Sequence, residues 1–177
     1  MRRIEDAAGQ ELSWHRDGMI KREFTLQAGD EPVATLQWQK AFGSLARYAT
    51  GDGSWTLKRG GFWHPHVTVR TEGSDADIAT FEAHMGGGGT LIAPDGSRLD
   101  WKSANFWHSQ WTWQDPAGAP LIHYRSREGL KLEGHVTIEA AAAVRADLSL
   151  LVGLGWYLLV LLTQDRNTAT VGATTGT

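Results

Sequence analysis

The sequence predicts an all-β domain with one helix, in which a closed antiparallel barrel of about twelve short strands encloses a hydrophobic C-terminal α-helix. Three observations predict this fold. Short stretches of alternating apolar and polar residues fill most of the chain before residue 140. Nine tryptophans and 21 glycines in 177 residues favour many strands joined by tight turns. An uncharged apolar run, Leu148 to Leu162, follows the last of these stretches.

The alternation is clearest in the segment VATLQWQK at residues 33–40, where Ala34, Leu36 and Trp38 share one face and polar residues occupy the other. A period of two indicates a half-buried strand. Similar runs are predicted at 11–16, 19–27, 44–50, 54–59, 62–71, 78–84, 89–93, 97–103, 105–114, 119–126 and 132–139. Turn sequences rich in Asp, Pro and Gly separate several of them, at 17–18, 51–53, 94–96 and 115–118. These turns suit antiparallel hairpins, so a meander is the expected topology.

An internal repeat relates residues 52–69 to residues 95–113. Both copies contain DGS, then FWH, then a Thr with Val or Trp on each side. Period-two alternation through the repeat predicts that the bulky residues point into the barrel, because burial of large apolar side chains contributes most to a core. The inward set is expected to be Trp63, Val67 and Val69 in the first copy and Trp107, Trp111 and Trp113 in the second. The histidines would then point outward.

The C-terminal apolar run predicts a central helix over residues 141–164, within a single barrel domain over residues 1–165, and a flexible tail over 166–177. Asp147 and Asp165 bound the run, which is shorter than the ~20 apolar residues of a typical membrane span. A segment that is apolar on all sides is typical of an enclosed helix. Gly153 and Gly155 weaken a helix, yet they would let a tryptophan-bearing strand approach its axis closely.

Composition excludes several functional classes. Hydrophobic residues make up 41% and charged residues 21% of the chain, as in ordinary globular domains. The net charge of -3 and the pI near 6.1 give no overall attraction to nucleic acid. Without cysteine there is no disulfide framework, thiolate zinc site or cysteine nucleophile. Glu5 and Asp6 interrupt the segment where a signal peptide needs apolar residues, so the protein is expected to stay in the cytoplasm.

Three segments carry a resemblance to a known family: SWTLKRGGFWHPHVTVR at 54–70, DWKSANFWHSQWTWQDPAGAPLIHYR at 100–125 and DLSLLVGLGWYLLVLL at 147–162. In their order and periodicity they resemble the tubby C-terminal-like superfamily, which includes LURP-one-related proteins and phospholipid scramblases, and in particular its small bacterial members. The resemblance implies a barrel around a central helix and a connection to lipids. Neither an acidic calcium loop nor a tubby-type basic motif matches this sequence residue by residue.

Two sets of candidate site residues follow. Lys58, Arg59, Arg98 and Lys102 are the candidates for contact with anionic lipid headgroups, provided that they gather on one side of the barrel. His64 and His66 share a strand face, a spacing used in metal sites of cupin-like barrels, and Glu72 follows them.

The function expected from the sequence is therefore a non-enzymatic barrel without a cofactor, which binds anionic phospholipid headgroups or a protein partner at the membrane surface. The chain has neither a GxSxG elbow nor a P-loop. Two alternatives stay open at this stage. One is a metal-dependent cupin-like enzyme that uses His64, His66 and Glu72, and the other is a protein tail-anchored through residues 148–162.

Overall fold

The predicted architecture is confirmed. A computed structural model, which describes residues 1–18, 22–127 and 132–174, shows a closed barrel of twelve antiparallel strands around one long helix. The strands follow one another around the barrel in chain order, and β1 closes the ring against β12, so the sheet is a simple meander. Their bounds are β1 Leu12–Arg16, β2 Glu23–Ala28, β3 Glu31–Trp38, β4 Ala46–Thr50, β5 Ser54–Gly60, β6 His66–Thr71, β7 Asp77–Ala83, β8 Gly89–Ile92, β9 Arg98–Ser103, β10 Gln110–Gln114, β11 Pro120–Arg127 and β12 Glu133–Ile138. A 3-10 turn, η1 Glu5–Ala7, precedes β1.

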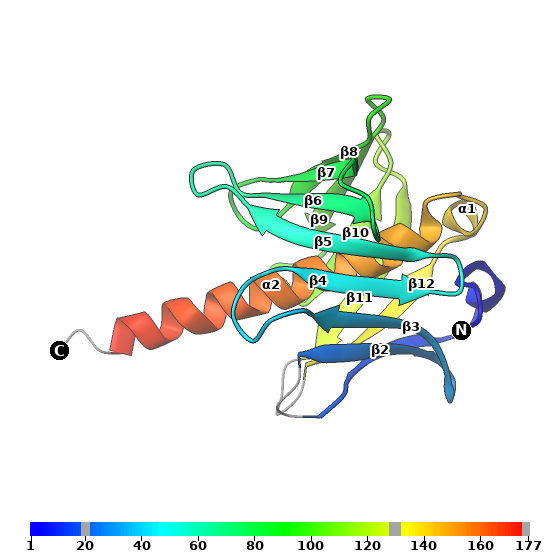
Figure 1. The fold of residues 1–177 in the computed structure, drawn as a ribbon, viewed down its shortest axis with the longest axis horizontal. Coiled ribbons are helices and arrows are strands. Elements are labelled where there is room, and N and C mark those ends of the chain that lie inside the picture. Colours follow the sequence, from blue (N-terminus) through cyan, green and yellow to red (C-terminus); the bar gives the residue numbers. More distant parts are fainter. Residues whose placement is uncertain (19–21, 128–131, 175–177) are drawn as a thin grey trace.

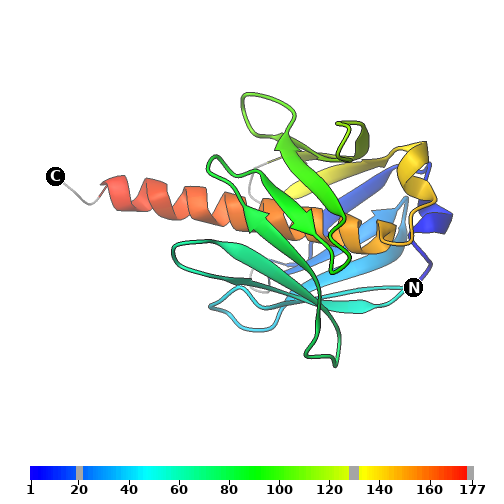
Figure 2. The same cartoon turned by 90° about the horizontal axis from the view of Figure 1, so that it is seen from above.

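The meander gives the barrel two distinct ends. Since each strand runs opposite to its neighbours, successive connections alternate between the ends. The helix α2, Leu148–Thr174, begins near one of them, here named the start end, where Ser149 lies against Asp52 of the β4–β5 connection. It leaves through the other, the exit end, where Asp165 pairs with Arg59. Figures 1 and 2 show α2 running through the barrel and extending well beyond it.

The helix bounds expected from the sequence are wrong at both ends. The alanine-rich segment forms only a short helix, α1 Ala140–Ala143, and α2 starts afresh at Leu148. Between them Arg145 donates two hydrogen bonds of 2.8 Å to the Asp147 carboxylate, which stabilises a turn instead of a continuous helix. At the other end the expected flexible tail is helical through Thr174, because the sequence has no proline to stop it.

The core consists of aromatic side chains packed on the helix. Trp14 of β1 stacks on Trp156 of α2 with ring centroids 5.7 Å apart. Buried aromatic polar groups bond to the helix backbone: the Tyr48 hydroxyl donates to the Ser149 carbonyl at 2.8 Å, and Trp113 Nε1 donates to the Leu151 carbonyl at 3.1 Å. These bonds satisfy polar groups that would otherwise be buried without partners, and they fix the height of the helix in the barrel.

The two helix glycines do allow close approach, although the groups that approach are not the expected ones. A Cβ at Gly153 would lie 2.4 Å from the ring of Tyr48, and a Cβ at Gly155 would lie 2.4 Å from the ring of Tyr124. Tyrosines of β4 and β11, rather than tryptophans, therefore occupy the space that the glycines leave.

The internal repeat forms two corresponding hairpins, β5–β6 and β9–β10. Val67, Val69, Trp111 and Trp113 point into the barrel as predicted. For the first tryptophan of each copy the prediction is wrong, since Trp63 is 84% exposed and Trp107 is 79% exposed. Both lie in the turn that precedes β6 or β10, where the alternation of a strand no longer applies.

Candidate functional site

Exposed apolar side chains gather at the exit end of the barrel. They project from four successive connections at that end: β3–β4 (residues 39–45), β5–β6 (61–65), β7–β8 (84–88) and β9–β10 (104–109). The six most exposed are Phe42, Phe62, Trp63, Met85, Phe106 and Trp107, here named the apolar loop tips. At the start end, the large apolar side chains of comparable exposure in the described residues are Met1 and Val144. The apolar exposed surface is therefore strongly one-sided.

The two copies of the repeat build matching tips. In the first, the rings of Phe62 and Trp63 meet edge to face, with centroids 5.2 Å apart at 89°. In the second, Phe106 and Trp107 repeat this arrangement at 5.5 Å and 82°. The same Phe-Trp pair thus stands outward from two hairpins that lie four strands apart in the barrel.

Hydrogen bonds hold these turns in shape. In the second copy the Asn105 side-chain oxygen accepts the backbone N–H groups of Ser109 and Gln110, at 3.0 and 3.1 Å, and Trp111 Nε1 donates to the His108 carbonyl at 2.9 Å. His108 adopts a positive φ of 53°, which turns the chain back into β10. Because the turn is fixed by bonds behind the rings, the rings of Phe106 and Trp107 are held outward.

Charges are distributed unequally between the two ends. Within the described residues, the carboxylates in the connections of the exit end are Asp17 and, on the emerging helix, Asp165. The connections of the start end and the N-terminal segment hold many more: Glu5, Asp6, Glu11, Asp30, Asp52, Glu72, Asp75, Asp95, Asp115, Glu139 and Asp147. Arg2, Arg3 and Arg145 pair with some carboxylates of the start end but are far fewer than these carboxylates. The connections of the exit end carry Arg22, Lys40 and the imidazoles of His64, His84 and His108. An approaching anionic surface would meet the exit end with less repulsion than the start end.

The structure does not bring the four headgroup candidates together. Lys58 and Arg59 are neighbours in β5, so they point to opposite faces of the sheet. Lys58 is exposed on the outer face, whereas Arg59 reaches Asp165 of α2 at 2.7 Å. Arg98 lies at the start-end limit of β9, and Lys102 lies on the outer face of that strand, 3.5 Å from Asp100. Lys58 and Lys102, at equivalent positions of the repeat, are exposed on the outer face behind the Phe-Trp pairs of two hairpins that lie four strands apart.

Several contacts secure the helix where it leaves the barrel. In addition to the Arg59–Asp165 pair, Arg22 donates to the Gln164 side chain at 2.8 Å. The Tyr157 hydroxyl donates to the Ser44 carbonyl at 2.7 Å and accepts the Arg59 backbone N–H at 3.1 Å. Burial of this hydroxyl raises the pKa of Tyr157 to about 12. The β3–β4 and β5–β6 connections are thus tied to the same turn of α2.

The metal-site hypothesis does not match the geometry. His64 and His66 lie at the exit end, but Glu72 follows β6 at the start end, roughly 20 Å along the strand at ~3.3 Å per residue. There Arg47 binds the Glu72 carboxylate, and this hydrogen bond lowers the pKa of Glu72. The described part of the chain contains no group of three His, Asp or Glu side chains placed to hold a metal ion. The cupin-like arrangement of these three residues is therefore wrong.

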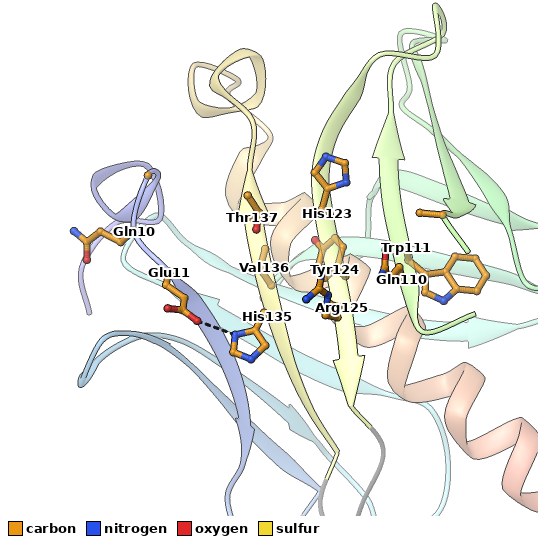
Figure 3. Close-up of a pocket in the computed structure, with 12 residues that line it drawn as sticks. Gln10, Glu11, Gln110, Trp111, His123, Tyr124, Arg125, His135, Val136 and Thr137 are labelled. Carbon is orange, nitrogen blue, oxygen red and sulfur yellow. Dashed lines mark ion pairs between the residues drawn. The ribbon is translucent and has the colours of Figure 1, made fainter. Parts of the chain in front are cut away.

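The sequence did not indicate a hollow of about 650 Å³ on the outer wall, which lies at β10, β11 and β12 beside residues 9–11 (Figure 3). Carboxylates accompany both of its histidines: His135 lies 3.2 Å from Glu11, and His123 lies 3.0 Å from Glu139. Arg125 supplies a further cationic group to the lining. Contacts of this kind between exposed side chains on the outer wall contribute little individually.

No family model, curated protein or solved structure matches this chain. The resemblance to the tubby C-terminal-like superfamily remains a prediction.

One helix of the described residues is long and apolar enough to cross a membrane, over Leu148–Thr170. In this structure 78% of the apolar 18-residue stretch of this helix is buried inside the barrel. The segment that a tail anchor would place in lipid is thus the core of the domain.

Proposed function

We propose that the protein is a non-enzymatic barrel that binds the surface of an anionic membrane with the exit end facing the lipid. The observation that carries the proposal is the set of apolar loop tips. Trp and Phe are well suited to the membrane interface, where an apolar ring can leave water while neighbouring polar groups stay hydrated.

The spread of the tips favours a broad partner. They belong to four successive connections of the exit end. Trp63 and Met85 line one hollow of about 630 Å³ together with His64 and His84. A small ligand in that hollow would contact two of the connections, whereas a bilayer surface can contact all four together. At ~25 cal/mol per Å² of apolar area, withdrawal of ~80 Å² of each ring from water gives about 2 kcal/mol per aromatic tip.

Charge supports the same orientation. The carboxylate-rich start end would face away from an anionic surface, and Lys40 and Lys58 near the tips would face toward it. A basic side chain near an anionic leaflet contributes about 1 kcal/mol. Because the chain has a net charge of -3, we expect charge to orient the protein and the aromatic tips to supply most of the affinity.

The test is cosedimentation with vesicles of phosphatidylcholine containing a third phosphatidylserine. The double variant Trp63→Ala, Trp107→Ala should bind 10- to 100-fold more weakly than the wild type, since it loses two tips of about 2 kcal/mol each before compensation. Both rings are exposed, so the variant should fold normally. Val144→Ala is the matched control, because Val144 is equally exposed but lies at the start end.

Equal binding by the wild type and the double variant would contradict the proposal, as would absence of binding by the wild type. If the wild type binds no vesicles but binds one defined protein in a pull-down, and the double variant binds that protein more weakly, the alternative of a protein partner would be favoured. Circular dichroism of all three proteins checks that the barrel is intact.

A further inference from the structure

We infer that the part of α2 that projects beyond the exit end enters the lipid leaflet to which the apolar loop tips attach, an inference that rests on the proposed membrane-binding function. The helix that forms the core of the barrel would continue into the membrane as a short inserted segment. The argument comes from the direction, the length and the side chains of this segment.

Direction is fixed by the barrel. From Leu148 to Leu161 the helix is enclosed by the sheet, and it leaves between the same connections that carry the tips (Figures 1 and 2). A Cβ at Gly87, in the β7–β8 connection, would lie 3.2 Å from Leu162, and Arg59 of the β5–β6 hairpin holds Asp165. If tips on several sides of the helix touch one membrane surface, the projecting segment must point into that surface.

Length is also appropriate. From Asp165 to the last described helical residue, Thr174, nine residues at 1.5 Å each span about 14 Å. The hydrocarbon core of a bilayer is ~30 Å thick, so this segment can reach through the headgroup region into one leaflet and cannot cross the membrane.

The composition changes where the helix emerges. Asp165 and Arg166 lie at the rim, and the sequence after Arg166, NTATVGATTGT, has no charged residue. The segment consists of Asn167 followed by Thr, Ala, Val and Gly residues, so its transfer into an interface avoids the penalty that charged side chains meet in lipid.

Two threonine hydroxyl groups of this segment have partners within the helix. Thr168 Oγ1 donates to the Gln164 carbonyl and Thr170 Oγ1 donates to the Arg166 carbonyl, both at 3.0 Å. Threonine that bonds back to the carbonyl of the preceding turn brings no unpaired donor into a low-dielectric environment. These bonds lower the cost of placing Thr168 and Thr170 near hydrocarbon.

The test uses single labelled cysteines in the full chain, which has no cysteine of its own. The variants Ala169→Cys and Val144→Cys, both at exposed positions, are labelled with a nitrobenzoxadiazole fluorophore. On addition of vesicles of phosphatidylcholine and phosphatidylserine, the label at 169 should brighten at least twofold, shift to the blue and be quenched by nitroxides on the lipid acyl chains. The label at 144, at the start end, should not respond.

A second pair of variants measures the same insertion without a label. Ala169→Glu should weaken vesicle binding about fivefold, because a charged side chain is costly near hydrocarbon, while Ala169→Gln should bind like the wild type. Both substitutions keep a good helix former at an exposed site, so folding is preserved.

The outcomes separate the two proposals. Vesicle binding that depends on Trp63 and Trp107, with an aqueous, unquenched label at 169 and no effect of Ala169→Glu, would overturn the inference and leave the proposed function intact. Failure of the wild-type protein to bind vesicles would overturn both.

Discussion

The substitution Gly153→Ala places two known effects in competition at the centre of the barrel. Alanine in place of glycine inside a helix is worth about 1 kcal/mol of helix stability. Here, however, the new Cβ would lie 2.4 Å from atoms of the Tyr48 ring, which is fully buried and bonded to the Ser149 carbonyl. Overpacking of this kind costs about 1–3 kcal/mol, and disturbance of the buried hydrogen bond adds about 1 kcal/mol.

We therefore expect a net loss of about 2 kcal/mol in the free energy of unfolding. Urea titration followed by tryptophan fluorescence would show this as a midpoint about 1 M lower, for an m value near 2 kcal/mol/M. In a Tyr48→Leu background, which removes the ring, the same Gly153→Ala change should cost less than in the wild type or become stabilising. A Gly153→Ala protein at least as stable as the wild type would refute the close packing of Tyr48 on the helix.

Three further predictions concern charge and titration. Burial raises the pKa of Tyr157 from its ordinary value near 10 to about 12, so the hydroxyl loses its proton more easily in the unfolded chain than in the folded one. The stability that the protonated Tyr157 contributes is therefore complete below pH 10, and up to roughly 3 kcal/mol of it is lost between pH 10 and 12. Alkaline titration of stability should therefore be shallower in Tyr157→Phe. Arg59→Gln breaks the pair with Asp165 at the exposed rim, so it should change global stability by less than about 1 kcal/mol while it speeds amide hydrogen exchange in residues 162–170. Lys58→Glu should weaken binding to anionic vesicles severalfold, whereas Arg98→Glu, at the start-end limit of β9, should not.

The fold was predictable because its main signals are local. Alternation such as that of Ala34, Leu36 and Trp38 specifies a strand and its buried face, and each hairpin turn carries its own Gly and Asp residues. The uncharged C-terminal run must be removed from water, and the strands that make up most of the chain can bury it by closing into a barrel around it. The helix bounds were not predictable in the same way, since they depend on the Arg145–Asp147 contact and on the absence of any strong stop signal after Asp165.

The candidate site was less predictable, for two different reasons. Lys58 and Arg59 are adjacent in a strand, so a period of two already implies opposite faces, and treating them as one basic patch overlooked that geometry. Trp63 and Trp107 present the other problem. Each of these tryptophans fits the alternation of apolar and polar residues in the strand that follows it. The sequence alone does not show that this strand begins only at His66 in the first copy and at Gln110 in the second. The repeated FWH motif was the sequence signal that could have indicated the exposed tips. In the structure its Phe and Trp side chains project from the turns and are not part of the core.

The repeated Phe-Trp pairs are difficult to explain by folding alone. The barrel interior is filled by other aromatic residues, such as Trp101 and Trp113. The hydrogen bonds that hold the second turn involve Asn105 and the Trp111 indole, which donates to the His108 carbonyl, and not the exposed Phe-Trp pair. An exposed Phe-Trp pair adds little to the stability of its own hairpin, and large exposed apolar patches on soluble domains usually mark a contact surface. Four such rings, on two turns with the same edge-to-face geometry and beside the emerging helix, are therefore best explained by a contact outside the chain. The proposed membrane interface would match both the aromatic rings and the low density of carboxylates in the connections that carry them.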